Sequence, residues 1–348
     1  MRFNPKRWAR AATRCAAALL ACAAIAPAVA HQVDTNAPLT LKDEGSFFVG
    51  GRDLASDTLS TLPQADPNGT VTVEQMYVQY QIPAHAKAPS LVLIHGCCLT
   101  GATWETTPDG RMGWAQYFAR SGYPVYVIDQ AGRGRSAANA VSIGGVRSGR
   151  LPPDALPAGF FVGREFAWTL FRFGPKYPQA YPGMQFPLEA QQQFWKQMVP
   201  DWAYSMGTPN PTVPSLGQLA ARLKKTVLVS HSQSGIYPFQ TLASGASGVA
   251  AIVAVEPTAC PAATGDVSVY TRVPVLLLYG DFIAQSAWAP RYAACRSFAD
   301  AVNQAGGHVD VVSTTDLGMH GNTHMMMQDR NNLEIADFIT GWVGRNVH

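Results

Sequence analysis

The chain has 348 residues, of which 47% are hydrophobic, and a formal net charge of +3. This length and composition suit one large α/β domain with a sizeable buried core. Beyond the first thirty residues there is no basic run or interleaved aromatic patch. The clustered positive surface that binds nucleic acid is therefore excluded.

The first thirty residues are typical of a secretory signal peptide. Five basic residues precede an Ala- and Leu-rich run over residues 15–25, and Ala28-Val29-Ala30 fits a cleavage site. The run is shorter than the ~20 residues of a membrane-spanning helix, which argues against a transmembrane anchor. Cys22 has only a partial likeness to a lipoprotein attachment site. We expect cleavage after Ala30, and a secreted or periplasmic domain over residues 31–348 with no membrane span.

Removal of this segment changes both the charge and the cysteine content. It leaves 21 Lys and Arg against 23 Asp and Glu, a formal net charge of −2. Four cysteines remain, and an even number in an oxidising compartment favours disulfides. Cys260 and Cys295 are the natural long-range pair. The adjacent Cys97 and Cys98 either bridge each other through a strained ring or stay reduced, and no metal-ligand spacing accompanies the four.

From about Thr70 onward, short β-rich runs alternate with helical stretches. This alternation predicts an α/β fold with a mostly parallel sheet and helices on both faces. The expected strands are Val71 to Gln81, Leu91 to His95, Val125 to Asp129, Thr226 to Ser230, Ile252 to Glu256, Val275 to Tyr279 and Val309 to Ser313. Several are continuous Val/Ile/Leu runs, as buried parallel strands are. Residues 31–69 give little indication of structure.

The expected strand at 91–95 ends in His95-Gly96 and continues into a loop. Acyl transfer needs backbone N–H groups aimed at the developing oxyanion, one of them just after such a His-Gly pair. Cys97 or Cys98 occupies that position. A disulfide between them would hold the loop rigidly. The alternative, a reactive catalytic thiol, is disfavoured because a serine occupies the nucleophile position described below.

Between residues 137 and 214 the periodicity gives way to Pro, Gly and aromatic residues. The aromatic residues include Phe160, Phe161, Phe166, Trp168, Phe171, Phe173, Trp195 and Trp202. Long ordered insertions are often lids, which favours a substrate-covering cap inserted into the α/β domain. The alternative is an irregular connection whose aromatic residues pack on the core.

Residues 227–235, Val-Leu-Val-Ser-His-Ser-Gln-Ser-Gly, predict a buried strand, a turn of small residues and the start of a helix. This is the setting of a nucleophile elbow, where small neighbours allow a sharp turn that lifts a serine hydroxyl clear of the sheet. Ser230 and Ser234 replace both glycines of the usual G-x-S-x-G pattern, and a serine-rich helix cap is the alternative. The preceding strand favours Ser232 as nucleophile and the N–H of Gln233 as an oxyanion donor.

Two carboxylates are candidates for the acid that orients the catalytic histidine. Asp281 follows the strand at 275–279, the position that most hydrolases with such an elbow use. Glu256 ends the strand at 252–256, directly after the nucleophile's helix. A lone carboxylate at the edge of an apolar strand is costly unless paired, which is a functional hint. The residues alone leave both open.

The candidate base follows the last expected strand, where both His320 and His324 lie. His324 is favoured because it is closer to the final helix, expected to begin near Asp329, and His320 is the alternative. Residues 325–327, three methionines, either line an adaptable apolar pocket or begin that helix and pack inward.

Several segments carry a resemblance to a known family. Residues 129–136, Asp-Gln-Ala-Gly-Arg-Gly-Arg-Ser, are similar to the D-x-x-G-x-G-x-S turn of the α/β-hydrolase superfamily. His-Gly-Cys-Cys at 95–98, Ser-His-Ser-Gln-Ser-Gly at 230–235, Val-Glu-Pro at 255–257 and the His-Gly-Asn-Thr-His segment at 320–331 resemble a narrower group. That group is a small set of secreted bacterial arylesterases with sequential cysteines, and the likeness covers most of the mature chain.

The resemblance implies an α/β-hydrolase fold, a homodimer and activity on small aryl esters. In that group the acid is a glutamate after the strand that follows the nucleophile. The histidine is the second one of the His-Gly-Asn motif, and the sequential cysteines form a disulfide beside the oxyanion hole. These roles fall on Glu256, His324 and the pair Cys97 and Cys98. The resemblance thus favours Glu256 over Asp281.

The expected reaction is hydrolysis of a small carboxylic ester through an acyl-enzyme on Ser232, with His324 as base and Glu256 as acid. No metal or organic cofactor is expected. One alternative keeps the triad but changes the bond to a lactone, a thioester, an amide or a polyester. Another is a catalytically silent hydrolase fold used for binding.

Overall fold

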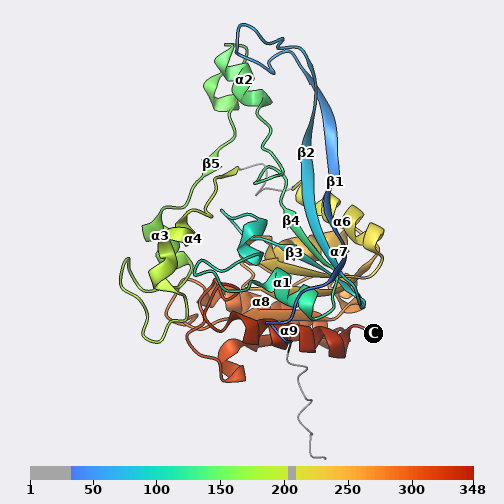
Figure 1. Cartoon of the computed structure of the whole chain (residues 1–348), viewed down its shortest axis with the longest axis vertical. Coiled ribbons are helices and arrows are strands. Elements are labelled where there is room, and N and C mark those ends of the chain that lie inside the picture. Colours follow the sequence, from blue (N-terminus) through green and yellow to red (C-terminus); the bar gives the residue numbers. More distant parts are fainter. Residues whose placement is uncertain (1–32, 203–208) are drawn as a thin grey trace, which may run out of the picture. The chain divides into compact units, whose positions relative to one another are not determined.

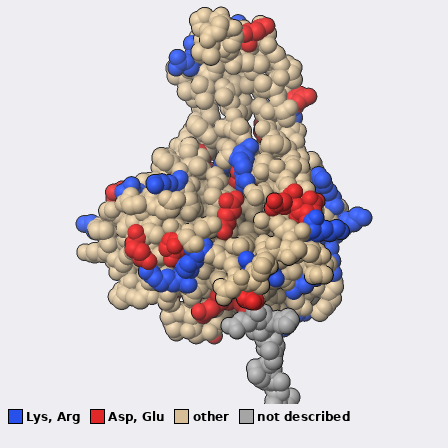
Figure 2. All heavy atoms as spheres, in the orientation of Figure 1, with Lys and Arg blue, Asp and Glu red and all other residues tan. Residues whose placement is uncertain are grey.

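The computed structural model describes residues 33–202 and 209–348. The expected signal peptide and its cleavage site lie outside the described residues. Among the described helices, none combines the length and apolar character needed to cross a bilayer. On the face shown in Figure 2, basic and acidic side chains are interspersed among wide uncharged areas.

An eight-stranded sheet forms the centre of the fold (Figure 1), in the order β1-β2-β4-β3-β7-β8-β9-β10. The strands are β1 (Leu41–Ser56), β2 (Gly69–Pro83), β3 (Ser90–Ile94), β4 (Val125–Asp129), β7 (Thr226–His231), β8 (Val249–Val255), β9 (Val275–Tyr279) and β10 (Val309–Ser313). β2 runs antiparallel to β1 and β4, and all other neighbours are parallel. The predicted α/β fold with a mostly parallel sheet is confirmed.

The long strand β1 was not expected from the sequence. It contains Gly50 and Gly51, both with positive φ, and most of its side chains are at least partly exposed, so it lacks the apolar run of a buried strand. Its backbone groups find their partners in β2, with which it pairs along nearly its whole length. The hairpin is thus specified by pairing between two segments rather than by local pattern.

The parallel strands are buried on both faces because helices cover each side of the sheet. The helices are α1 (Trp114–Arg120), α2 (Val141–Arg147), α3 (Arg164–Leu170), α4 (Gln191–Trp195), α6 (Thr212–Leu223), α7 (Tyr237–Ala243), α8 (Ala289–Gln304) and α9 (Asn332–Asn346). Successive strand residues point to opposite faces. In β3, Leu91 and Leu93 join the core formed with α1 and α9, whereas Val92 and Ile94 join the core formed with α6 and α7.

The described residues of the predicted insertion at 137–214 carry α2, α3, α4 and two short strands, β5 (Gly159–Phe160) and β6 (Asp201–Trp202), which pair with each other. Short 3₁₀ turns also lie within it, at Pro153–Ala155 and Leu188–Ala190. α2 lies beside the tip of the β1–β2 hairpin, where the Thr58 hydroxyl donates to the Val141 carbonyl at 3.4 Å.

The aromatic residues of the insertion divide into two groups. Trp168, Phe171 and Phe173 are buried and belong to the main core, as the core-packing interpretation expects. Phe161 is 65% exposed, and Phe160 and Phe166 are exposed beside it with their rings in edge contact.

The final helix begins at Asn332 rather than near Asp329. The three methionines at 325–327 therefore do not start it: they lie in turns before it, fully buried in the main core. The Asp329 carboxylate accepts hydrogen bonds from Thr323 and Asn322, in the loop that carries His324. Asp329 therefore belongs to this loop, and the helix begins after it.

Candidate active site

Ser232 stands at the tight turn that follows β7. Its φ is +58°, in the left-handed region that a non-glycine residue rarely adopts, and the residue is almost buried, with 6% exposed. Such strain is typical of a nucleophile held on an elbow. The segment after β3 passes so close to this turn that residue 96 has to be a glycine. A Cβ at Gly96 would lie 2.8 Å from the Cβ of Ser232.

The serine that replaces the second elbow glycine forms hydrogen bonds that glycine lacks. The Ser234 hydroxyl lies 3.0 Å from the Ile94 carbonyl, and it accepts the His231 N–H at 3.2 Å. The small residue that the turn requires is displaced by one position, to Gly235, where a Cβ would lie 2.5 Å from the Cβ of Pro257. The departure from the usual pattern therefore preserves the turn.

The loop after β3 carries a disulfide between Cys97 and Cys98, and a second disulfide joins Cys260 to Cys295 in α8. Cys98 has a φ of +62°, and its N–H donates to the Asp201 carboxylate at 3.1 Å. Because the Cys98 N–H is engaged in this way, the N–H groups of Cys97 and Gln233 are the candidate oxyanion donors.

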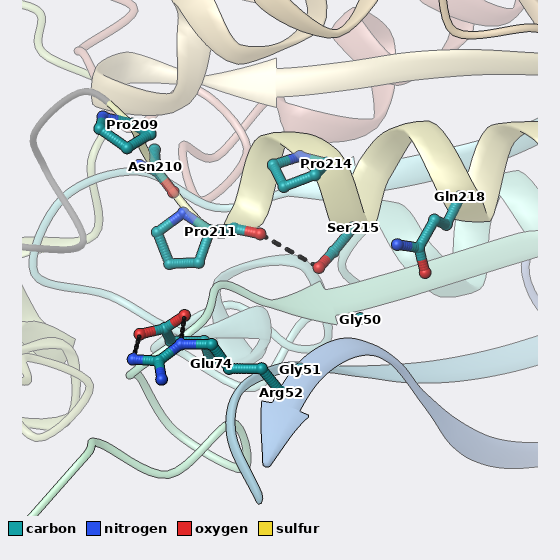
Figure 3. Close-up of a pocket in the computed structure, with 10 residues that line it drawn as sticks. All are labelled: Gly50, Gly51, Arg52, Glu74, Pro209, Asn210, Pro211, Pro214, Ser215 and Gln218. Carbon is teal, nitrogen blue, oxygen red and sulfur yellow. Dashed lines mark hydrogen bonds and ion pairs between the residues drawn. The ribbon is translucent and has the colours of Figure 1, made fainter. Parts of the chain in front are cut away.

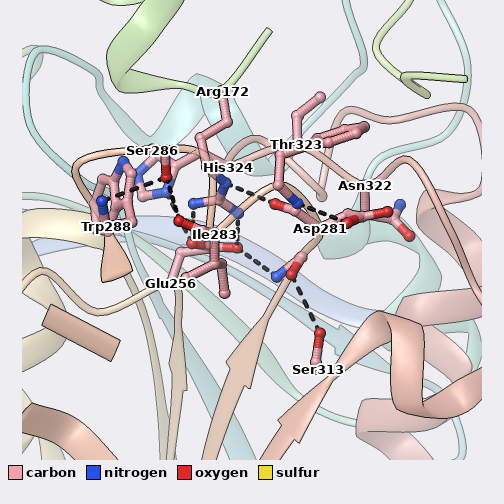
Figure 4. A network of polar contacts seen from close by, with 12 residues as sticks. Arg172, Glu256, Asp281, Ile283, Ser286, Trp288, Ser313, Asn322, Thr323 and His324 are labelled. Carbon is pink, nitrogen blue, oxygen red and sulfur yellow. Dashed lines mark hydrogen bonds and ion pairs between the residues drawn. The ribbon is translucent and has the colours of Figure 1, made fainter. Parts of the chain in front are cut away.

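His324 is fully buried and held on several sides. Its Nδ1 lies 3.1 Å from Glu256 Oε2 (Figure 4). Its N–H donates to the Phe171 carbonyl at 3.0 Å, and its carbonyl lies 2.9 Å from His231 Nε2. Its ring stacks on Phe171 and contacts the ring of Trp288. No described residue bonds Nε2, the nitrogen opposite the carboxylate, so it can accept a proton.

Burial lowers the pKa of His324 to about 4, against the opposing influence of Glu256. The pKa of His231 is also lowered well below its ordinary value, chiefly by burial. Both imidazoles are therefore neutral near pH 7. A neutral His231 can donate its Nε2 proton to the His324 carbonyl, and a neutral His324 can act as a base.

Glu256 directly follows β8 with a φ of +53°. Its two oxygens accept a bidentate pair of hydrogen bonds from Arg172, at 2.5 and 2.7 Å, and Gly280 donates a further N–H. Burial by itself would raise the pKa of Glu256, but the charge and hydrogen bonds of Arg172, with a contribution from His324, bring it well below its ordinary value. The carboxylate is therefore ionised although it is fully buried.

The two alternative residues lie apart from this arrangement. The half-buried carboxylate of Asp281 accepts the N–H groups of Phe282 and Gly321, at 2.7 and 3.0 Å, and does not bond His324. His320 is exposed, and its carbonyl accepts the side-chain amide of Gln185 at 3.3 Å. Both carboxylates follow the ends of adjacent strands, but the structure places Glu256 rather than Asp281 against His324.

The loop that carries His324 is tied down by a buried carboxylate. Asp329 accepts the N–H and the hydroxyl of Thr323, at 2.7 and 2.8 Å, and the side-chain amide of Asn322 at 3.2 Å. Burial raises the pKa of Asp329 to about 7, although these donors oppose the shift. This network fixes the residue next to His324.

Sequence reasoning did not identify four buried residues of this region: Arg133, Arg172, Asp201 and His231. Arg172 and Asp201 belong to the insertion, where the only available signal was a charged residue among aromatic residues. Burial raises the pKa of Asp201 to about 6, against the influence of Arg133, with which it forms a fully buried ion pair. Buried charges of this kind need a partner, and here the partners come from distant segments.

A separate surface cavity of about 410 Å³ lies between the β1–β2 hairpin and the start of α6 (Figure 3). Its lining includes Arg52 and Glu74, which form an ion pair, and the prolines at 209, 211 and 214. None of the candidate catalytic or oxyanion residues lines it, so it is distinct from the candidate active site.

The chain is similar to known proteins in sequence and in structure. No family model matches the chain. In sequence it is 26% identical over 328 residues, 77% of this chain and 85% of the relative, to the probable secreted lipase phiG of Fungal sp. (strain ATCC 74256). In structure it matches a novel bacterial esterase with 59% identity and a TM-score of 0.88, over 90% of this chain and 98% of that one. The chain therefore belongs to the family of this bacterial esterase.

Proposed function

We propose that the protein is a secreted carboxylic ester hydrolase that cleaves small aryl esters through a triad of Ser232, His324 and Glu256. The observation that carries the proposal is the 3.1 Å contact between His324 Nδ1 and an ionised Glu256, beside a strained serine elbow. This contact selects the tautomer with its proton on Nδ1. The opposite nitrogen is then a proton acceptor, as a general base requires.

In the first half of the reaction His324 Nε2 takes the hydroxyl proton of Ser232 as the serine oxygen attacks the ester carbonyl. The carbonyl oxygen becomes negative and is held by the N–H groups of Cys97 and Gln233. The intermediate collapses, and the departing alcohol takes its proton from His324. Water then loses a proton to His324 and attacks the acyl carbonyl. The bond to Ser232 breaks, the serine oxygen takes the proton back from His324, and the acid is released. Glu256 stabilises the imidazolium in both halves of the reaction.

The test is labelling and turnover of the mature protein. We expect a fluorophosphonate probe to modify Ser232. We also expect phenyl acetate to be hydrolysed with at least about tenfold higher kcat/KM than cyclohexyl acetate, after each rate is divided by that of hydroxide-catalysed hydrolysis. Failure to label Ser232 would indicate a binding protein without catalysis. Labelling with faster turnover of a lactone or a thioester would assign a different acyl bond.

The pH at which kcat/KM falls should depend on the positive charge of Arg172, because this charge lowers the pKa of His324. Because protonated His324 cannot act as a base, kcat/KM should fall as the pH drops through about 4, the pKa of His324. Arg172 lowers this pKa, as does Arg291. In Arg172→Met the acid limb of the kcat/KM profile should therefore move to higher pH, because the pKa of His324 rises towards its ordinary value.

Arg172→Lys is the matched control, because it keeps the charge but loses the bidentate geometry. Its acid limb should stay closer to that of the wild type. Removal of one partner from a buried ion pair is destabilising, so folding of each variant should be checked by circular dichroism. An unchanged acid limb in a folded Arg172→Met would contradict the assignment of His324 as the titrating base.

We also propose that the insertion at 137–214 is a cap over the substrate site. Support comes from its contacts: Phe171 accepts the His324 N–H, and Arg172 binds Glu256. The exposed aromatic side chains of Phe160, Phe161 and Phe166 are available as an apolar surface of this cap. Their replacement by serine should raise KM for aryl esters with little effect on kcat, as measured by initial rates.

Export and a homodimer complete the proposal. The relative named as a secreted lipase and the disulfide between Cys260 and Cys295 both fit an extracellular protein. Support for removal of residues 1–30 comes from the pattern of the leader, and support for the dimer comes from the resemblance to arylesterases. Light scattering of the purified mature protein would contradict the dimer if it gave the mass of one chain.

A further inference from the structure

The peptide group between Gly96 and Cys97 is fixed by hydrogen bonds to its carbonyl oxygen. A peptide is planar, so the direction of the Gly96 carbonyl fixes the direction of the Cys97 N–H on its other side. That carbonyl accepts a hydrogen bond from Arg133 Nη1 at 3.1 Å, and His95 Nδ1 lies 2.9 Å from it. Two groups therefore determine where the candidate oxyanion donor points.

The second of these groups donates as a neutral histidine. His95 Nε2 accepts the N–H of Gln130 at 3.0 Å, which places the ring proton on Nδ1, facing the Gly96 carbonyl. Burial lowers the pKa of His95 to about 4, so the ring is uncharged near pH 7. Of the two groups that bond this carbonyl, Arg133 is therefore the charged donor.

The same guanidinium reaches the other side of the elbow. Arg133 Nη2 donates to the side-chain oxygen of Gln233 at 3.1 Å, and Gln233 is the residue whose N–H is the second candidate oxyanion donor. Arg133 is also in a fully buried ion pair with Asp201, whose other oxygen accepts the Cys98 N–H. One side chain thus connects both donor segments, and through Asp201 it connects the β6 strand of the insertion.

We propose that Arg133 is the positioning residue of the oxyanion hole and that its two hydrogen bonds fix the Gly96–Cys97 peptide and Gln233. This inference rests on the proposed function. A donor to the carbonyl polarises the peptide and strengthens the N–H at its other end. Donors that are fixed in a water-excluded region favour a negative oxygen in the transition state over the neutral carbonyl of the bound ester.

The experiment compares Arg133→Met with the wild type. Active sites are first counted by titration with a fluorophosphonate, and kcat and KM for phenyl acetate are then expressed per active site. We expect kcat to fall by about 10² to 10³, the loss typical for one oxyanion donor, with KM changed by less than about threefold. The affinity for phenylboronic acid, which forms a tetrahedral adduct on Ser232, should fall by a similar factor.

A second variant guards against a folding defect. Arg133→Met leaves Asp201 buried without its partner, which is destabilising, whereas the double variant Arg133→Met/Asp201→Asn removes the buried pair as a unit. The double variant should show the same loss of kcat and of boronate affinity. Arg135→Met is the matched control, because Arg135 belongs to the same turn but is 37% exposed and bonds Asp129; its kcat should be unchanged.

The outcomes separate this inference from the proposed function. If Arg133 has only a structural role, fewer sites will titrate, but the kcat of each site and the boronate affinity will be those of the wild type, and the inference is overturned. If Ser232→Ala is inactive while folded Arg133 variants keep full kcat, the inference alone fails. If Ser232→Ala keeps the activity, the proposed function itself fails.

Discussion

Replacement of Ser232 by alanine is expected to lower kcat for phenyl acetate by about 10⁶-fold, the loss seen when a catalytic serine is removed from a comparable triad. The reason is that no acyl-enzyme can form, so water must attack the ester directly. The remaining oxyanion donors and bound substrate still provide a slow reaction above the uncatalysed rate. Initial rates at high enzyme concentration measure the residual activity. Mass spectrometry shows whether the fluorophosphonate probe still labels the variant.

Ser230→Ala provides a control within the same turn. The Ser230 hydroxyl is buried and has no hydrogen-bond partner among the described residues, so its removal breaks no recorded bond. Alanine is also small enough for this position of the elbow. Activity of Ser230→Ala should stay near that of the wild type. A large loss in both variants would show that disturbance of the turn, rather than loss of the nucleophile, explains the result with Ser232→Ala.

Replacement of Glu256 by glutamine is expected to lower kcat by about 10⁴-fold, as in other triads whose acid is changed to its amide. An amide next to His324 no longer selects the tautomer with its proton on Nδ1, and it no longer stabilises the imidazolium. The change also deprives Arg172 of its carboxylate partner. The measurement is kcat at neutral pH for the folded variant. Active sites are counted by fluorophosphonate labelling carried to completion, since the variant should label slowly.

Asp281→Asn is the matched control for this change. Asp281 sits at the end of the neighbouring strand and is bonded to the N–H groups of Phe282 and Gly321 rather than to His324. An asparagine oxygen can keep one of these bonds, so kcat should remain within about tenfold of the wild type. Collapse of activity in Asp281→Asn, with Glu256→Gln nearly normal, would return the acid to Asp281 and contradict the proposed triad.

Much of the framework was predictable because it depends on local pattern. The predicted strand ranges agree with the observed ones to within three residues, since continuous apolar runs bounded by turns are hard to place anywhere except in a buried parallel sheet. The small residues around Ser232 likewise predicted a sharp strand-to-helix turn, and the structure has one there. The hairpin strand β1 escaped prediction because its partner, β2, and not its own composition, stabilises it.

The sequence by itself therefore determined the layered sheet, the elbow and the set of candidate side chains at the carboxyl ends of its strands. Only the tertiary structure decided which carboxylate lies against His324. Glu256 and Asp281 follow adjacent strands and are equivalent in local pattern. The choice depends on Arg172, which comes from an insertion more than eighty residues away and holds Glu256 in charged form. Contacts between distant segments have no signature in the periodicity of either segment, and a buried charge is stable only where the folded chain brings its partner to it.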